Sequence, residues 1–591
     1  MNYKYNLHYF ARFLWNLFPD CVIIYICFFM KTIEEEIPLK NNNLKKSLIS
    51  LVTALSLGLS LTACGGSGNQ GDSQTGTQST STSSAAVEEG TLRTAVLYDI
   101  STMDITQTTD DYMIPMNIFD RLFETRTVDG TAQVVKSLCD DYKVSEDGLT
   151  YDFTLKSGIV FSNGSALTAS DVKYSFERIL IAAAQNTDIP LEIVGSDALM
   201  NKETDTLEGF TVTDDTHFSV TLKAPNAGFL AELSAPAMSI VDAETMAEVK
   251  NFGKEPADTI GTGPYVVTEW EANDHYTLTY NDKYWGEEPS VKKLIVRVIP
   301  DPNTQNLMFQ NGELDMIDLI NLDSAIVQSS YKSTYADKIV TAPRVGLSYL
   351  LLNENNEYLK DLNVRKAIGM AIDVDSIITN LYSGDAIREN GIIPTGIWGH
   401  NDALEGFTYD TAAAKKLLED AGYQDGQISF ELSMDSSSTS DTQLLYQEIS
   451  QQLSKIGINA TIKSYDHSAW LALRGSGTMD SFVARWGMDY NDPSNIMYTF
   501  FGSEENTKGR SLNYPDKEII ARVAAAPAIV DDAERMAEYQ ALEKKIISED
   551  AAWIPLFEEL HLYCMGERVK SFTPQWAGFS DFYAIDVVLK N

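Results

Sequence analysis

A short segment near residue 490 concentrates side chains that suit a binding site. Trp486, Asp489 and Tyr490 place two aromatic rings and a carboxylate beside Gly487. A glycine lets a backbone approach a guest closely, and apolar walls with a few polar groups are typical of ligand pockets. The pattern therefore predicts a ligand site. The alternative is that Asp489 caps a local turn and Trp486 belongs to the core, although Asp492-Pro493 already provides turn chemistry.

The sequence shows no motif that is typical of an enzyme active site. Its six histidines form no pair at metal-ligand spacing and no HExxH motif. It also lacks a GxSxG elbow, a phosphate-binding glycine loop and a dinucleotide-binding glycine fingerprint. Acidic pairs such as Asp110-Asp111 and Asp214-Asp215 are expected on a solvated surface. We expect no enzyme and no metal or other cofactor; a secreted hydrolase, the alternative, would need a nucleophile with a base.

Composition sets the class of protein and its partners. The chain has 591 residues, of which 44% are apolar and 22% charged, as in globular proteins with core enough for about three or four domains. With 84 Asp and Glu against 45 Lys and Arg, the net charge is −39, which repels the phosphates of nucleic acids. We expect no nucleic-acid partner. Five scattered cysteines predict no disulfide framework, and whether Cys139 and Cys564 pair stays open.

The N-terminal region indicates export. Two lysines at 45 and 46 precede the apolar run 47–61, which ends in Leu61-Thr62-Ala63-Cys64. This pattern resembles a bacterial lipoprotein signal, which implies cleavage before Cys64 and lipidation of Cys64; a plain signal anchor is the alternative. We therefore expect residues 1–63 to be a signal region. Its first 43 residues do not fit such a signal, which indicates that the translation start is misassigned. The Gly-, Ser- and Thr-rich segment 64–90 predicts a lipidated cysteine followed by a flexible linker.

Beyond residue 90 the sequence predicts strands mixed with helices. Alternating Tyr151, Phe153 and Leu155 predict a strand, and Thr168 predicts the cap of a helix. The C-terminal half is richer in helices: apolar positions at helical spacing predict helices over 364–372, 410–421 and 445–456. A glycine ends the last helix and a strand follows at 458–462, which is an α/β unit.

Four sequence blocks, in order, resemble one family. They are SEDGLTYDFTLKSGIVFSNGSALTASDVKYSFER within 138–178, GTGPY at 261–265 with NDKYWG at 281–286, NVRKA at 363–367 with AID at 371–373, and WGMDYNDP at 486–493. Together they resemble the extracytoplasmic solute-binding proteins, family 5, the oligopeptide- and dipeptide-binding lipoproteins of peptide ABC transporters.

The resemblance implies an α/β fold of the two-lobed periplasmic-binding-protein type with an extra small inserted domain. It places lobe I at 91–118, 246–345 and 553–591, the inserted domain at 119–245, and lobe II at 346–552. In this family the carboxylate that matches Asp489 binds the α-ammonium of a peptide, while neighbouring backbone pairs with the peptide as an added strand.

The same resemblance gives a set of candidate peptide-binding residues. Trp398 lies in a segment, 393–399, similar to a loop near the ligand, and Tyr349 lies in the expected strand 348–353. Segment 108–112 matches only loosely the family's N-terminal strand that faces the peptide, because Ile105 stands where a proline is common. The full set is Asp489, Trp486, Arg485, Gly487, Tyr490, Trp398, Tyr349 and Tyr112.

These expectations define one function with open alternatives. The protein is expected to be a monomeric receptor, anchored by lipid to the outer face of the bacterial cytoplasmic membrane. It would bind peptides between its lobes and deliver them to the permease subunits of an ABC importer. A nickel- or metallophore-binding relative, and a peptide sensor or adhesin not coupled to transport, remain alternatives. Peptide length and the residue that binds the peptide C-terminus are not predicted.

Overall fold

The computed structural model describes residues 88–108, 112–128, 131–182, 187–249, 252–320, 322–575 and 582–590. They belong to one compact unit, which starts at Ala86. Cys64, the expected signal region and the expected linker up to residue 87 lie outside the described residues. Within the described residues, no helix combines the length and apolar character needed to span a membrane.

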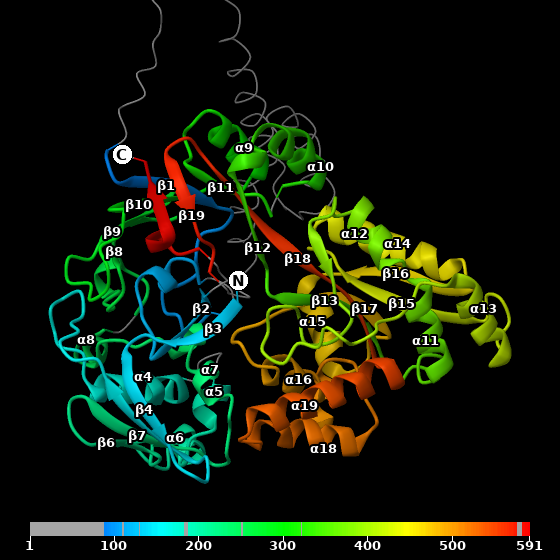
Figure 1. The fold of residues 1–591 in the computed structure, drawn as a ribbon, viewed down its shortest axis with the longest axis horizontal. Coiled ribbons are helices and arrows are strands. Elements are labelled where there is room, and N and C mark those ends of the chain that lie inside the picture. Colours follow the sequence, from blue (N-terminus) through cyan, green and yellow to red (C-terminus); the bar gives the residue numbers. More distant parts are fainter. Residues whose placement is uncertain are drawn as a thin grey trace, which may run out of the picture. The chain divides into compact units, whose positions relative to one another are not determined.

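The first sheet joins the beginning of this unit to its middle. Its strand order is β1 (Thr91–Val96), β10 (Lys293–Val298), β9 (His275–Tyr280) and β8 (Tyr265–Glu271), in which only β1 and β10 run parallel. The C-terminal strands β19 (Val569–Phe572) and β20 (Val587–Leu589) pair with each other and pack into the same apolar core. Chain segments from both ends therefore build this part of the fold (Figure 1).

A second, antiparallel sheet lies within the segment predicted as the inserted domain. Its order is β4 (Cys139–Val144), β5 (Thr150–Leu155), β7 (His217–Thr221) and β6 (Phe210–Val212). The predicted alternation is confirmed, because Tyr151, Phe153 and Leu155 are buried. Helix α4 (Ala169–Ile181) begins at the predicted cap: the Thr168 backbone N–H donates to the Asp171 carboxylate at 2.8 Å, as in a capping box. A separate hairpin, β2 (Phe123–Val128) and β3 (Thr131–Lys136), precedes this sheet.

The largest sheet has the order β11 (Met316–Asp318), β18 (Trp553–Met565), β13 (Gly346–Leu352), β17 (Ser481–Gly487), β15 (Ile428–Asp435) and β16 (Ile458–Tyr465). Two further strands, β12 (Ile339–Pro343) and β14 (Ala386–Arg388), also pair with β18. The thirteen-residue β18 is shared, because its first part pairs with β13 and its second with β11 and β12. In Figure 1 this strand, drawn in red, runs between the two groups of elements.

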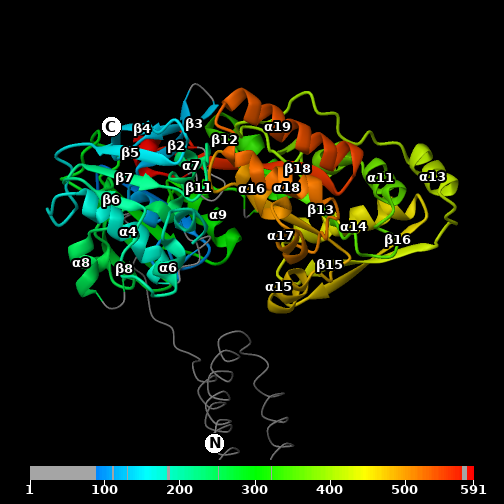
Figure 2. The same cartoon turned by 90° about the horizontal axis from the view of Figure 1, so that it is seen from below.

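Helices cover both faces of this sheet (Figure 2). One core contains residues of α11 (Leu362–Ala371), α13 (Thr411–Asp420) and α14 (Ser440–Ser454), and the other contains residues of α16 (Ser494–Phe501), α18 (Lys517–Ala525) and α19 (Asp532–Lys544). The three predicted C-terminal helices are confirmed, and their ends agree within about two residues except at the start of α14, which begins five residues before the predicted position 445. The remaining α-helices are α5 (Asp188–Leu191), α6 (Ser196–Met200), α7 (Phe229–Glu232), α8 (Ala243–Glu248), α9 (Pro302–Gln310), α10 (Ser324–Ile326), α12 (Val374–Asn380), α15 (His467–Ser476) and α17 (Glu504–Gly509).

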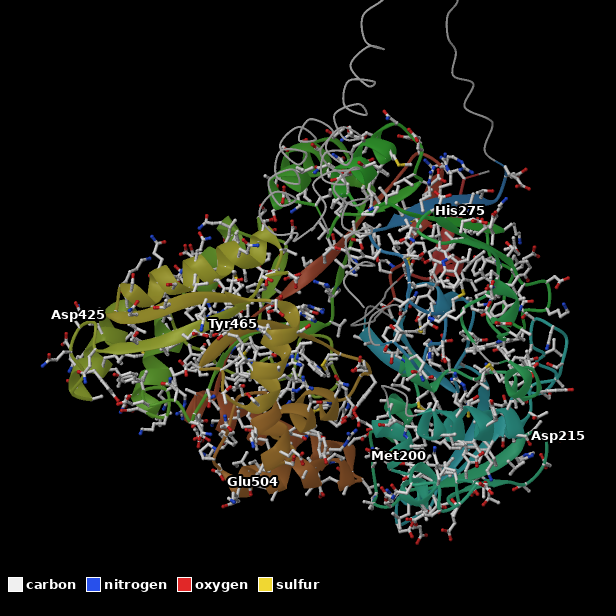
Figure 3. All side chains as sticks on the ribbon, turned by 180° about the vertical axis from the view of Figure 1, so that it is seen from behind. Met200, Asp215, His275, Asp425, Tyr465 and Glu504 are labelled. Atoms are coloured by element: carbon white, nitrogen blue, oxygen red, sulfur yellow. The ribbon has the colours of Figure 1, made fainter. Side chains whose placement is uncertain are left out.

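The structure shows the role of two sequence features, the GTGPY segment and an acidic pair. In the GTGPY segment, a Cβ on Gly261 or Gly263 would lie 2.2 or 2.5 Å from the Ile118 carbonyl oxygen, so these glycines permit close packing of two backbones. Neither glycine adopts a positive φ, so the close approach of the Ile118 backbone, and not an unusual backbone angle, is what favours glycine there. The exposed side chain of Asp215 lies at the periphery (Figure 3), as expected for the acidic pair that it forms with Asp214.

Candidate ligand site

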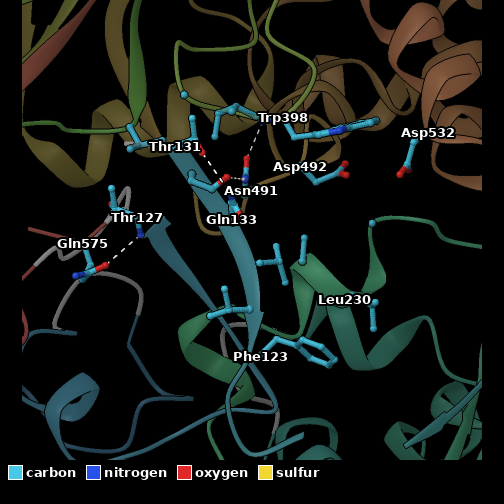
Figure 4. Close-up of a pocket in the computed structure, with 18 of the residues that line it drawn as sticks. Phe123, Thr127, Thr131, Gln133, Leu230, Trp398, Asn491, Asp492, Asp532 and Gln575 are labelled. Carbon is cyan, nitrogen blue, oxygen red and sulfur yellow. Dashed lines mark hydrogen bonds between the residues drawn. The ribbon is translucent and has the colours of Figure 1, made fainter. Parts of the chain in front are cut away.

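A cavity of about 1040 Å³ lies between the β2–β3 hairpin and the predicted lobe II. All six residues of β3 line it, together with residues of α7, β12 and α19 and the loop that carries Trp398 (Figure 4). This volume is at the upper end of the range for small-molecule sites, so the cavity is large enough for a ligand of several linked units. Of the eight candidate residues, only Trp398 lines this cavity.

Asn491 connects the two sides of the cavity. Its side-chain nitrogen donates to the main-chain oxygen of Ala132 in β3 at 3.1 Å, and its side-chain oxygen accepts from the Trp398 N–H at 2.8 Å (Figure 4). Both groups of the amide are thus used, which fixes its orientation. The loop after β17 is thereby tied to the hairpin and to the Trp398 loop.

A buried ion pair supports the Trp398 wall. The Arg535 guanidinium on α19 donates to the carboxylate of Asp492, and both side chains are at least 95% buried. The same guanidinium lies 4.1 Å from the centre of the Trp398 ring. A cation over an aromatic face is attracted to it, more strongly where water is excluded. Arg535 therefore holds both the turn at Asp492 and the indole in place.

Carboxylates of the inserted segment approach this ion pair from the other side. Glu232 on α7 is buried, and Asn226 donates hydrogen bonds to Glu232 and to Glu192. Burial raises the pKa of Glu232 well above its ordinary value, and the charge of Glu192 raises it further. Arg535 opposes that shift. The region between the two predicted domains thus contains several acidic groups around one guanidinium.

Asp489 carries a partly buried carboxylate that accepts a hydrogen bond from a neutral amide. The Asn495 side chain donates to it at 3.1 Å and accepts from the Trp486 indole N–H at 2.9 Å, so one amide holds two of the candidate residues. Burial raises the pKa of Asp489, and the charge of Asp188 on α5 raises it further. No lysine or arginine of the described chain is among the charges that lower this pKa. A cation placed here would relieve the cost of the buried charge.

Arg485 and Gly487 lie on β17 beside these residues. Arg485 donates to the main-chain oxygen of Arg344 at 2.6 Å, and burial lowers the pKa of its guanidinium to about 9. Side chains alternate along a strand, so Arg485 and Trp486 point to opposite faces of the sheet. Gly487 pairs with Gly346 of β13.

The three candidate tyrosines are embedded in apolar clusters. Tyr349 is 3% exposed, and its ring centre lies 4.2 Å from that of Trp553. Tyr112 is also 3% exposed, and its hydroxyl donates to the Thr108 carbonyl at 3.0 Å. Tyr490 is partly buried against the core of the inserted segment. In this structure Tyr349 and Tyr112 present little surface to a ligand.

Sequence reasoning missed β3, Asn491 and Arg535 as parts of the site. Asn491 lies within the WGMDYNDP block, where its position offered a signal. The sequences of β3 and around Arg535 give no such signal, because these segments contact the WGMDYNDP block only in the folded structure. Arg365, in the NVRKA block, forms a buried ion pair with Glu354 at 2.9 Å.

Known proteins match nearly all of the described region. Residues 133–508 match the family model for the middle region of bacterial extracellular solute-binding proteins, family 5. The probable D,D-dipeptide-binding periplasmic protein DdpA of Escherichia coli strain K12 is 26% identical over 498 residues, 83% of this chain and 92% of that protein. Heme-binding protein A of Haemophilus influenzae is 25% identical over 486 residues, 80% of this chain and 87% of that protein.

A solved structure supports the same assignment. The ABC transporter-associated periplasmic binding protein DppA from Helicobacter pylori, in complex with the peptide STSA, has a TM-score of 0.68 and 27% sequence identity to this chain. The match covers 85% of this chain and 98% of that one. The relatives named here are binding proteins and not enzymes. The chain belongs to the bacterial extracellular solute-binding proteins of family 5, with the two-lobed fold of mixed helix and sheet that these extracytoplasmic proteins share.

Proposed function

We propose that this protein is a lipid-anchored receptor that binds peptides between its two lobes and delivers them to an ABC importer. A family 5 relative is named for D,D-dipeptides, and the H. pylori protein binds the peptide STSA. Peptide bound by both lobes stabilises the closed arrangement, because it makes its full contacts only when the lobes are together. The permease would then recognise that closed form.

Asp489 is the observation that carries the peptide assignment. Its carboxylate is partly buried, accepts a hydrogen bond from a neutral amide and has a raised pKa. A free peptide offers the missing partner in its α-ammonium group, and a charge-assisted hydrogen bond is stronger than one between neutral groups. The net charge of −39 attracts cations in general, but salt screens it over about 8–10 Å, so it cannot select an ammonium group.

The cavity favours peptide over the metal or heme alternatives. None of its described lining residues is a histidine, cysteine or methionine, the side chains that most often ligate soft metals and heme iron. The described residues also contain no group of three or more His, Cys, Asp and Glu side chains arranged for a metal ion. A peptide sensor not coupled to transport would use the same site.

A four-affinity cycle tests the role of Asp489. Calorimetry would compare the parent and Asp489→Ala, each with one free peptide and with the same peptide N-acetylated. Truncating one partner of a buried charge pair typically costs about 2–5 kcal/mol, or roughly 30- to several-thousand-fold in affinity. We expect that loss for the free peptide and much less for the acetylated one, which lacks the ammonium charge.

Asp402→Ala is the matched control, because the Asp402 side chain is fully exposed. It should bind both peptides as the parent does. If Asp489→Ala stays folded and loses equal affinity for both peptides, the coupling is zero and Asp489 does not bind the ammonium group. If the parent binds neither peptide and instead retains nickel or heme, the peptide assignment itself is wrong.

A further inference from the structure

Two arginines beside the candidate ligand residues carry guanidinium groups without a carboxylate partner. Arg474 lies in the last turn of α15, and Arg510 directly follows α17. Both residues are partly buried, yet within the described residues neither guanidinium forms an ion pair or donates a hydrogen bond. The Nε atom of Arg474 is fully buried and has no acceptor in the described chain. Burying a charge without a partner is costly, so an anion bound here would stabilise both groups.

The two guanidiniums act on each other and on the same neighbour. Burial lowers the pKa of Arg510, and the positive charge of Arg474 lowers it further. Both charges also oppose the rise in the pKa of the Tyr349 hydroxyl that burial causes. Among the described carboxylates, that of Asp188, an exposed residue of α5, opposes the shift of Arg510. Like charges at close range disfavour each other, and one anion between them removes that cost.

Aromatic rings hold both guanidiniums without using their N–H donors. The guanidinium carbon of Arg510 lies 4.9 Å from the centre of the Trp486 ring and 5.3 Å from that of Phe500. The guanidinium carbon of Arg474 lies 5.2 Å from the centre of the Trp470 ring. A cation is attracted to an aromatic face, while the donors of a guanidinium lie in its own plane. Each group is thus positioned and still able to donate hydrogen bonds to a carboxylate.

This pair of arginines adjoins Asp489 through Trp486. The Asn495 side chain donates to the Asp489 carboxylate at 3.1 Å and accepts from the Trp486 indole N–H at 2.9 Å. Arg510 lies over the same indole, so a negative and a positive group flank one ring, and both Trp486 and Asp489 are partly exposed. An acidic residue at the start of a peptide carries the matching groups, because its ammonium group and its side chain leave the same Cα atom.

We propose that Arg474 and Arg510 form an anion subsite that binds the side-chain carboxylate of an acidic first residue. The protein then prefers peptides that begin with glutamate, with the ammonium group at Asp489 and the carboxylate between the two guanidiniums. This inference rests on the proposed function and names the class of peptide that the site selects. The net charge of −39 repels anionic peptides in general, so a preference for glutamate has to come from a local site.

The first experiment isolates the glutamate carboxylate. Calorimetry compares Glu-Ala-Ala with Gln-Ala-Ala, both amidated at the C-terminus, so that the glutamate side chain supplies the one carboxylate in the pair. We expect the glutamate peptide to bind about 10- to 150-fold more tightly, the range typical of hydrogen bonds to charged groups. Equal affinities would overturn the anion subsite and leave the proposed function standing. Binding of neither peptide, amidated or with a free C-terminus, would reject both.

Two further comparisons test the assignment to the first residue. The amides of Ala-Glu-Ala and Ala-Gln-Ala make the same change at the second residue, where we expect a preference of less than about threefold. A free C-terminus on Gln-Ala-Ala restores a carboxylate at the other end, and any gain in affinity should be unchanged by substitution of either arginine. A larger preference at the second residue, or a terminal gain that is lost in the arginine variants, would overturn the assignment.

Neutral variants locate the anion subsite on the two arginines. Arg474→Gln and Arg510→Gln should each reduce the preference for glutamate to less than about threefold, and leave the affinity for the Gln-Ala-Ala amide within about threefold of the parent. Arg510→Lys keeps the charge but not the planar fork of donors, so it should retain an intermediate preference. Arg522→Gln is the matched control, because it removes the same charge from α18, where Arg522 pairs with Glu538.

Melting temperatures show whether each variant folds. Parental preference for glutamate in folded Arg474→Gln and Arg510→Gln would overturn the proposal. An equal loss of affinity for both peptides would also overturn it, because the arginines would then support the fold of the site without contacting the carboxylate. Arg522→Gln should keep the parental preference. A loss of preference in this control as well would show that net charge, and not the anion subsite, selects the peptide.

Discussion

The side-chain nitrogen of Asn491 donates a hydrogen bond to the main-chain oxygen of Ala132, although 359 residues separate the two in sequence. The bond joins the loop after β17 to the edge of β3, two segments on opposite sides of the cavity. Because the Asn491 oxygen also accepts from Trp398, one residue couples the hairpin, the Asp489 loop and an aromatic wall.

Asn491→Ala should weaken peptide binding. The variant loses the contact between the hairpin and the Asp489 loop, and it frees the Trp398 N–H. Because a hydrogen bond contributes about 0.5–1.5 kcal/mol, we expect the loss of this contact to lower affinity by roughly 2- to 13-fold. Calorimetry with one free peptide measures the change in affinity. Asn459→Ala, at an exposed position of β16, is the control and should bind as the parent does. Equal affinity for all three proteins would show that the Asn491 bond does not support closure.

Arg535→Met should destabilise the fold, because it leaves the Asp492 carboxylate buried without its cation. Losing one partner of a buried ion pair typically costs about 3–5 kcal/mol. Arg535→Lys should retain only part of the stability that the ion pair provides, since lysine lacks the planar guanidinium that stacks on Trp398. Urea denaturation followed by tryptophan fluorescence measures the transition midpoint.

The control for Arg535 is Arg522→Met. Arg522 also pairs with a carboxylate, that of Glu538, but its side chain is 37% exposed. Exposed ion pairs contribute only about 0–1 kcal/mol, so this variant should shift the midpoint little. A similar shift for the two methionine variants would mean that burial does not distinguish the pairs.

How far the sequence predicts this fold depends on whether a feature is local. Helix α14 and strand β16 follow from apolar spacing and from Gly457, whose φ of 81° is a left-handed conformation that glycine adopts readily. The cap at Thr168 follows in the same way from residues three apart. Such signals depend on neighbours in the sequence, and the structure confirms them.

The site is less predictable, because distant segments build it. Trp398 lines the cavity as expected, but Tyr349 packs into an aromatic core with Trp553, more than two hundred residues away. Whether a strand residue faces the core or a cavity depends on what covers that face of the sheet. The role of β3 cannot be predicted from the sequence either. Its contact with the cavity depends on the folded chain, in which β3 pairs with β2 alone among the described strands.

Cys64→Ser should abolish attachment to the membrane. The sequence Leu61-Thr62-Ala63-Cys64 resembles a lipoprotein processing site, and the thiol of Cys64 would carry the acyl chains. We expect the parent to partition into the detergent phase of a Triton X-114 extraction and the variant into the aqueous phase or an unprocessed form. Ser67→Ala, in the expected linker, should behave as the parent. Parental partitioning of Cys64→Ser would exclude Cys64 as the anchor.

Glu232→Gln should stabilise the ligand-free protein increasingly as the pH rises. Burial raises the pKa of Glu232 well above its ordinary value, with Glu192 adding to the shift. A raised pKa in the folded state means that the stability present at low pH is lost as the pH rises through that pKa, because the folded protein must then bury a charge. Glutamine keeps an amide in place of the acid and never ionises.

The measurement is the melting temperature of parent and variant between pH 5 and pH 9. We expect the two curves to lie close together at pH 5, and the variant to melt at progressively higher temperature than the parent above that. Glu505→Gln, at an exposed position of α17, is the control and should show no such divergence. If the difference between parent and Glu232→Gln stays constant across this range, Glu232 does not take up its charge at a raised pKa, and the acidic cluster beside Arg535 does not make stability depend on pH.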